Sequence, residues 1–169
     1  MRSFKKLLVV FGLLFVTSVH SVDDNITRAL WASHAIINIY HYNHDTYLAD
    51  QKHIARYFSA SAWINYTKAI NAAQLPELIK KNQWQVRSVP IKPPVLKSLP
   101  DNHWQADMPV LVQYKNPQRE QYQTVNVSIQ FGPAKKGTGI DGWTIDSFQA
   151  NILQQPCQCA VQQAKINIQ

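Results

Sequence analysis

Four histidines in the first third of the chain are the residues with the clearest potential to bind a metal. They are His34, His41, His44 and His53. The first two are seven residues apart and the next pair three apart, so one helical face could present them. Zinc and copper sites usually add a carboxylate at a fixed spacing, and no HExxH signature accompanies the nearby Asp45 and Asp50. We therefore interpret these histidines as scattered, half-exposed residues and predict no metal site.

Two aspartates lie within predicted strands and are the candidates for acid–base chemistry. A cone-shaped α+β domain can hold a buried carboxyl group as a general base, as in ketosteroid isomerase. Asp107, however, alternates with Trp104, Ala106 and Met108, which puts it on the opposite face of its strand, and Asp146 lies in the last strand. The chain has no GxSxG, P-loop, GxGxxG or CxxC motif. We therefore predict no enzyme activity, no catalytic residue and no cofactor-binding residue.

The two cysteines, Cys157 and Cys159, are separated by one residue. In an oxidising compartment they could pair with each other, pair with a partner chain, or stay free. A bridge across one residue closes a very small ring, which adds little stability and is easily reduced. Two thiolates are also too few for a structural zinc site. A local disulfide is the only site that we predict for this pair.

The N-terminus has the layout of a secretory signal peptide. Three basic residues among the first six precede an apolar run of ten residues from Leu7 to Val16. A membrane-spanning helix needs about 20 apolar residues. Cleavage after Ser21 would leave small or compact residues at the −3 and −1 positions. We predict that residues 1–21 are a signal peptide and that the protein is periplasmic, with an inner-membrane anchor if the segment is retained.

The charge balance does not indicate nucleic-acid binding. The formal net charge is +7, but three of the 17 basic residues lie in the predicted signal peptide, so the remainder has 14 basic against 10 acidic residues, or +4. No block of five like charges occurs, and the runs Lys80-Lys81 and Lys135-Lys136 are typical of a solvated surface. A hydrophobic content of 46% is normal for a globular core.

Helical periodicity dominates the first half of the mature chain. It predicts helices over residues 24–43, 46–57, 60–73 and 75–82, the last with a proline in its first turn. Ser59 is the expected N-cap of the third helix, because its hydroxyl can accept a bond from a first-turn N–H group. The apolar stripe of this helix is Ala62, Trp63, Tyr66, Ala69, Ile70 and Ala73.

The period changes to two in the second half. Strands are predicted over residues 84–89, 103–114, 121–131 and 143–152. Pro90, Pro93 and Pro94 make the next segment an edge strand or an extended crossing, not a central strand. One face of the clearest strand is apolar, with Trp104, Ala106, Met108, Val110, Val112 and Tyr114. One face of the next carries Gln123, Val125, Val127, Ile129 and Phe131.

Helices followed by antiparallel strands predict an α+β fold, with the N-terminal helices packed on a four-stranded antiparallel curved sheet. Pro156 is expected to end the last strand. Residues 22–155 are then one domain, and residues 156–169 form a polar C-terminal tail.

The order of these features resembles the DotI/IcmL family of type IVB secretion proteins. The pieces that carry the resemblance are Trp31-Ala32, Tyr40, Asn43 to Tyr47, Tyr57 to Trp63, Tyr66, Ala69-Ile70, Pro94 to Leu96, Trp104-Gln105, Pro109 to Tyr114 and Gly139-Ile140. Together they span about residues 28–150, which is nearly the whole mature domain.

The resemblance implies a cone-like, nuclear transport factor-like fold in the periplasm. It implies a non-catalytic scaffold that binds other envelope proteins of a secretion or conjugation system and can self-associate. Standard members of the family have a cytoplasmic tail and a membrane-spanning helix before this domain, whereas here six residues precede a ten-residue apolar run. The alternative functions are a small-molecule-binding or isomerase-like domain that uses the interior of the cone, and a secreted factor unrelated to assembly.

Overall fold

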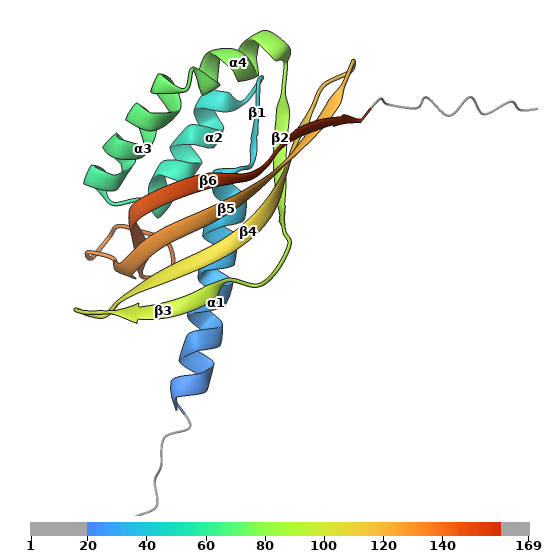
Figure 1. Ribbon diagram of the computed structural model, residues 1–169. Coiled ribbons are helices and arrows are strands. Elements are labelled where there is room, and N and C mark those ends of the chain that lie inside the picture. Colours follow the sequence, from blue (N-terminus) through green and yellow to red (C-terminus); the bar gives the residue numbers. More distant parts are fainter. Residues whose placement is uncertain (1–19, 160–169) are drawn as a thin grey trace, which may run out of the picture.

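The computed structural model describes the backbone of residues 20–159 and the side chains of residues 24–154 (Figure 1). The predicted signal peptide therefore lies almost wholly outside the described residues. The elements in chain order are α1 (His20–Ile39), β1 (Tyr42–Asn43), α2 (Tyr47–Ile54), the 3-10 helix η1 (Ala55–Tyr57), α3 (Ala60–Ala72), α4 (Leu75–Asn82), β2 (Gln85–Pro90), β3 (Val95–Leu99), β4 (His103–Lys115), β5 (Glu120–Pro133) and β6 (Trp143–Cys159).

The predicted α+β fold is confirmed, with six strands in place of four. The sheet is antiparallel in the order β1-β2-β4-β5-β6, and β3 pairs with the half of β4 that β2 leaves free. Figure 1 shows α1 crossing behind the curved sheet, while α2, α3 and α4 lie together beyond β6. The segment between β2 and β3, rich in proline, is the predicted extended crossing, and β3 is the edge strand that follows it.

The core lies between α1 and the concave face of the sheet. The two predicted apolar faces of β4 and β5 are confirmed, because every second side chain from Trp104 to Val112 and from Val125 to Phe131 is buried. Ala32, Ile36 and Ile39 of α1, all at most 1% exposed, pack in the same core. Burying an isoleucine side chain stabilises a fold by about 1.5–3 kcal/mol, so Ile36 and Ile39 hold α1 against the sheet.

Pro109 lies in the middle of β4, where a proline is normally excluded. It pairs with Asn126 of β5, and on its other side its carbonyl accepts a bond from the N–H of Ile91, in the crossing between β2 and β3. In an antiparallel strand the N–H and C=O of one residue point to the same side. The N–H that Pro109 lacks would therefore point at the crossing and not at β5, so no bond to β5 is lost.

The prediction that the first helix runs to residue 43 is wrong. α1 ends at Ile39, and Tyr42 and Asn43 form β1, which pairs with Val86 and Gln85 of β2. Tyr42 is 2% exposed. Pairing with β2 and burial of the Tyr42 ring therefore override the helical periodicity of the local sequence.

The prediction that Pro156 ends the last strand is also wrong, because β6 continues to Cys159. Thr124 of β5 pairs with Gln154, and Tyr122 pairs with Cys157, so two residues of β6 face one of β5 between these pairs. Pro156 is one of those two residues, in a bulge of an edge strand, where a missing N–H is tolerated.

Candidate interaction groove

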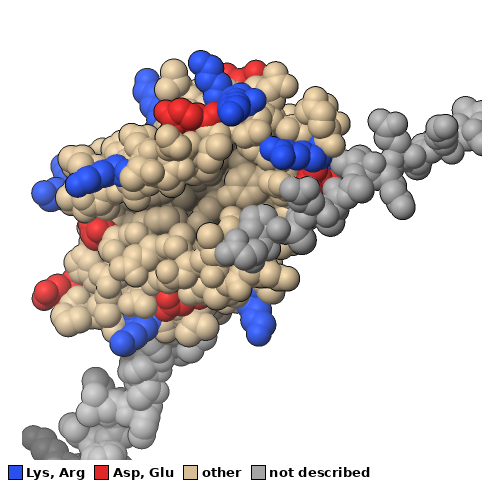
Figure 2. Space-filling view, turned by 45° about the horizontal axis from the view of Figure 1, so that its top comes forward, with Lys and Arg blue, Asp and Glu red and all other residues tan. Residues whose placement is uncertain are grey.

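A hollow lies between α3 and β6. It has a volume of about 660 Å³. Its walls come from α3 and from β6, and residues at the end of α1 and in β1 close its inner end. Figure 2 shows the face that contains this hollow, with uncharged residues around it and the Lys, Arg, Asp and Glu side chains towards the periphery. The sixteen lining residues are Ile39, Tyr40, Tyr42, Ala62, Asn65, Tyr66, Ala69, Ile70, Ala73, Leu75, Asp146, Ser147, Phe148, Gln149, Ala150 and Asn151.

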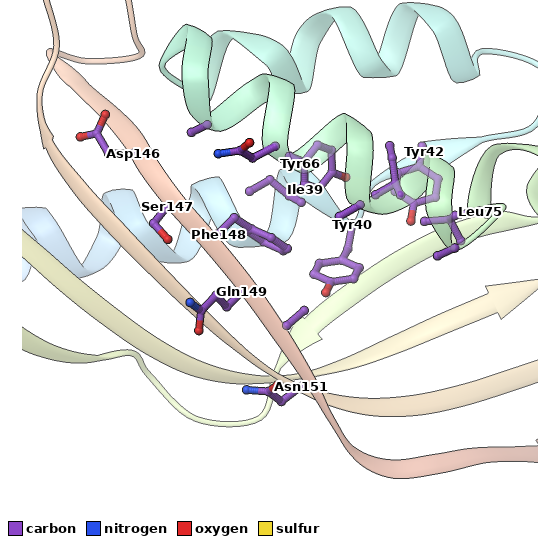
Figure 3. A pocket seen from close by; sticks show the side chains of 16 residues that line it. Ile39, Tyr40, Tyr42, Tyr66, Leu75, Asp146, Ser147, Phe148, Gln149 and Asn151 are labelled. Carbon is purple, nitrogen blue, oxygen red and sulfur yellow. The ribbon is translucent and has the colours of Figure 1, made fainter.

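An aromatic cluster fixes α3 on β6 at one end of this groove. Phe148 projects from β6 towards Tyr66 and Tyr40 (Figure 3), with ring centroids 5.4 and 6.4 Å away. Phe58 lies 5.0 Å from Tyr66 and 6.2 Å from Phe148. Tilted and edge-to-face contacts of this kind contribute about 0.5–1.5 kcal/mol each beyond the buried area. The cluster therefore sets the position of α3 and leaves the groove beside it.

The backbone adds a second anchor at the same end. Phe58 forms a parallel bridge with Ile145, and the N–H of Ser59 donates to the carbonyl of Ile145 at 2.9 Å. The predicted capping role of the Ser59 hydroxyl is wrong, since Ser59 occupies the N-cap position of α3 but makes no side-chain cap bond. Its hydroxyl lies 3.5 Å from that of Ser61 instead.

The predicted apolar stripe of α3 is only partly buried. Ala62 and Tyr66 are buried and Trp63 is half-buried, but Ala69 and Ala73, at the other end of the helix, are exposed and line the groove. Small side chains at these two positions leave the space open. Trp63 and Tyr66 therefore fill the space at one end of α3, and the groove stays open at the other.

Three tyrosines supply the polar atoms deep in the groove. Burial raises the pKa of Tyr40, Tyr42 and Tyr66 well above the ordinary value, and the neighbouring tyrosines raise it further. Their hydroxyls are therefore neutral at physiological pH. Among the lining residues, Asp146 alone is a charged type, and its side chain is 38% exposed. The groove thus suits an uncharged ligand with apolar groups and a few hydrogen-bonding groups.

The four histidines do not come together. His34, His41 and His53 are exposed, and Nε2 of His44 lies 3.1 Å from Oδ1 of Asp45. Within residues 20–159, no group of three or more His, Cys, Asp or Glu side chains could hold a metal ion.

The two aspartates have separate surroundings. Asp107 lies on the face of β4 opposite the core, as its alternation predicts, and accepts a 2.9 Å bond from Nε2 of Gln105. Asp146 lies at the rim of the groove, 3.4 Å from Nε2 of His103. Nδ1 of His103 donates to the carbonyl oxygen of Asp101 at 2.7 Å. Sequence reasoning missed this pair, since His103 and Asp146 are in strands that β5 separates.

The two cysteines fall in the final part of β6. Their Cα positions pair with Tyr122 and Glu120 of β5. Their side chains lie outside the described ones, so the disulfide stays a prediction.

The groove residues of β6 and the tyrosines at the end of α1 were not predicted from sequence. The small residues Ala62, Ala69 and Ala73 on one helical stripe were the available signal, because a stripe that alternates small and aromatic residues leaves gaps beside a sheet.

Helices packed on a curled antiparallel sheet are also the fold of solved VirB8-like domains. The crystal structure of CagV, a VirB8 homologue from Helicobacter pylori, has the same fold, with a TM-score of 0.62 at 11% identity over 76% of this chain and 99% of that one. The periplasmic domain of DotI matches with a TM-score of 0.68 at 20% identity, over 81% of this chain and 97% of that one.

Sequence similarity narrows the class to one family. The family model for an inner-membrane complex component of type IVb secretion systems, DotI/IcmL, matches residues 16–151. An IcmL-like type IV secretion system protein from Legionella pneumophila is 46% identical over 80% of this chain and 98% of its own, with a TM-score of 0.76. The chain therefore belongs to the DotI/IcmL family, and the predicted resemblance is confirmed. No curated protein matches it by sequence.

In the described part of the chain, no helix combines the length and the apolar character that crossing a membrane requires.

Proposed function

We propose that this protein is a non-catalytic periplasmic component or accessory of a type IVB secretion or conjugation system and acts by protein–protein contact. The observation that carries the proposal is the match to the family of inner-membrane complex components across residues 16–151. The 46% identity to an IcmL-like type IV secretion system protein supports the same role. Other envelope proteins of the secretion system are the expected partners, with self-association as a further contact.

The groove supports a binding role better than a catalytic one. Burial raises the pKa of its tyrosines above the ordinary value, so their hydroxyls stay protonated at physiological pH and serve as hydrogen-bonding groups. Asp107 is on the other face of the sheet. The remaining carboxylate, Asp146, is at the rim beside His103. The groove is concave and largely apolar, and both properties suit the binding of another chain.

Export is the second part of the proposal. The basic start and ten-residue apolar run of the N-terminus are typical of a signal peptide cleaved after Ser21. Sequencing the N-terminus of the protein from a periplasmic fraction tests this. A start at Val22 supports export with cleavage. A start at Met1 or Arg2 in the inner-membrane fraction would indicate a retained anchor.

Chemical crosslinking in cells followed by affinity purification tests the role in secretion. We expect envelope components of the type IVB system to co-purify with the tagged protein. An unrelated tagged periplasmic protein, expressed at the same level, is the control. Recovery of this chain alone, or of the same proteins as with the control, would contradict the proposal.

A second candidate function is the binding of a small uncharged molecule in the groove. The volume of about 660 Å³ favours it, because ligand pockets are typically about 300–1,000 Å³. The two functions differ in a simple readout. A small-molecule function predicts a compound that co-purifies with the protein and is found by mass spectrometry of the denatured sample.

A further inference from the structure

We infer that the outer edge of β6 binds an extended, uncharged segment of a partner protein as an additional strand, with alternate side chains of that segment entering the groove. The inference rests on the proposed function, because it names where and how a partner binds. The backbone of β6 and the walls of the groove carry it.

β6 is an edge strand, and part of its edge is already in use. It pairs with β5 on one side only. On the other side Phe58 and Ser59 pair with it at Ile145, and the chain then turns away into α3. A strand-like segment thus fits against this edge at the point where the groove begins. Beyond that point nothing within residues 20–159 covers the edge.

The register shows which backbone groups are free. Ile145 directs its carbonyl outward to Ser59, so its pair with Phe131 of β5 is the type without mutual hydrogen bonds. Along an antiparallel pair, every second pair is of this type. The next three along β6 are Phe148 with Ile129, Ala150 with Val127 and Ile152 with Val125. The N–H and C=O groups of Phe148, Ala150 and Ile152 therefore point outward. No described group bonds to them.

The side chains near these groups match an apolar strand. Phe148 and Ala150 line the groove, opposite Ala69 and Ala73 of α3. Further along the same edge, Ile152 is 57% exposed and Leu153 is 60% exposed. Unpaired edges with exposed apolar side chains are rare in proteins that work alone, because they recruit other strands. Strand addition uses the edge for affinity and the pockets beside it for specificity.

A second copy of this chain fits poorly. In an antiparallel β6–β6 pair the two-fold axis is perpendicular to the sheet, so both α3 helices lie on the same face. Pairing at Phe148 and Ala150 would bring two α3 helices into one groove. A different protein, presenting a flexible strand, has no such helix to accommodate. Since Asp146 is the one lining residue of a charged type, the matching segment lacks charges where it enters the groove.

Selection of seven-residue peptides from a random phage-displayed library on the purified full chain tests the inference. We expect enriched peptides to lack charges and to have apolar residues at every second position. Methylating the backbone nitrogens at one set of alternate positions should weaken binding by about tenfold or more, and methylating the other set should have little effect. No enrichment, charged peptides, a helical spacing of apolar residues, or equal effects of both methylation sets would overturn the inference.

Two proline variants on different edge strands locate the peptide. Ala150→Pro removes an outward N–H without removing a bond to β5, and should weaken peptide binding by about tenfold. Ser98→Pro removes an outward N–H from β3, far from the groove, and should bind as the wild type does. Hydrogen exchange of the wild type covers the case in which the Ala150→Pro variant fails to fold. The amides of Phe148, Ala150 and Ile152 should slow when the peptide binds, and unchanged exchange there would overturn the inference.

The outcomes separate this inference from the proposed function. If secretion components still co-purify with a folded Ala150→Pro variant, the partner binds elsewhere, and the inference fails while the proposed function stands. If peptides bind at β6 but no secretion component co-purifies, the proposed function fails instead. A concentration-dependent dimer that Ala150→Pro abolishes would make the occupant a second copy and overturn the inference.

Discussion

At the scale of single residues, Tyr42 has the clearest consequence for pH dependence. Its ring is buried under the groove, and desolvation, followed by the neighbouring tyrosines, raises its pKa well above the ordinary value of 10.0. The unfolded chain releases this proton near pH 10, whereas the folded chain keeps it. Above about pH 10 the folded state therefore binds more protons than the unfolded state, and stability falls by about 1.4 kcal/mol per pH unit for each such tyrosine.

Replacing Tyr42 by Phe should make the loss of stability above pH 10 less steep. Near pH 7 the phenol is protonated in both the folded and the unfolded state, so its titration adds no difference in stability between the variant and the wild type there. Urea denaturation at a series of pH values measures the free energy of unfolding near pH 7 and its slope above pH 10. An alkaline slope equal to that of the wild type would contradict the assignment of Tyr42 as a phenol that stays protonated in the fold.

Gly132 makes a second residue-scale prediction. A Cβ atom at this position would lie 2.4 Å from Cδ2 of His103, so the imidazole ring lies directly over the glycine. Gly132→Ala should lower the free energy of unfolding by about 1–3 kcal/mol, as overpacking does. His103→Ala alone loses the contacts to Asp101 and Asp146. In the double variant the added Cβ atom no longer meets the imidazole ring, so the cost of Gly132→Ala should be smaller there. We expect a favourable coupling of about 1 kcal/mol or more in the double-mutant cycle. If the effects of the two substitutions simply add, the imidazole ring of His103 does not lie over Gly132.

At the scale of elements, the start of α3 is held by the backbone and by aromatic packing. Ser59 occupies the N-cap position, but its N–H bonds to Ile145 while its hydroxyl caps nothing. The parallel bridge at Phe58 and the rings of Tyr66 and Phe148 supply the remaining contacts. The helix is therefore positioned by β6, the strand that also forms the opposite wall of the groove.

Ser59→Ala should consequently cost less than about 0.5 kcal/mol, whereas losing a working N-cap typically costs about 1 kcal/mol. Lys68→Gly, at an exposed position inside the same helix, is the positive control and should cost about 1 kcal/mol. Thermal unfolding of the two variants beside the wild type provides the comparison. A loss of 1 kcal/mol or more for Ser59→Ala would mean that the hydroxyl does cap the helix in solution.

At the scale of the whole molecule, one core joins the helices to the sheet. The buried residues form a single cluster that extends from Trp31 of α1 through β4 and β5 to Ile145 of β6. The groove interrupts the contact between α3 and the sheet but not this cluster. The molecule should accordingly behave as one cooperative unit, with a binding surface at its edge.

Five tryptophans make that expectation measurable. They are Trp31, Trp63, Trp84, Trp104 and Trp143. Three of them, Trp31, Trp104 and Trp143, surround Phe131. Trp84 packs on Tyr114 and Trp63 packs on Phe58, so tryptophan fluorescence reports on three regions of the molecule. In urea, the fluorescence and far-ultraviolet circular dichroism midpoints should coincide, as in two-state unfolding. An earlier fluorescence transition that Trp63→Phe removes would show that α3 unfolds separately.

The sequence by itself determined the class of fold and the faces of its main elements. A period of two from Trp104 to Val112 and from Val125 to Phe131 identified the buried face of the sheet, because side chains alternate along a strand whatever lies opposite. Helical spacing identified α2, α3 and α4, because side chains three and four residues apart lie on one face of a helix whatever packs against it. The ordered aromatic residues identified the family, which the comparisons confirm.

The tertiary structure alone decided where elements end and where the surface opens. α1 stops at Ile39 because Tyr42 pairs with Val86, and β6 passes Pro156 because an edge strand tolerates a missing N–H. The groove exists because the rings of Phe58, Tyr66 and Phe148 anchor one end of α3, while Ala69 and Ala73 leave the other end unfilled. These outcomes depend on residues far apart in the chain, and no local period encodes which distant strand or ring a residue will meet.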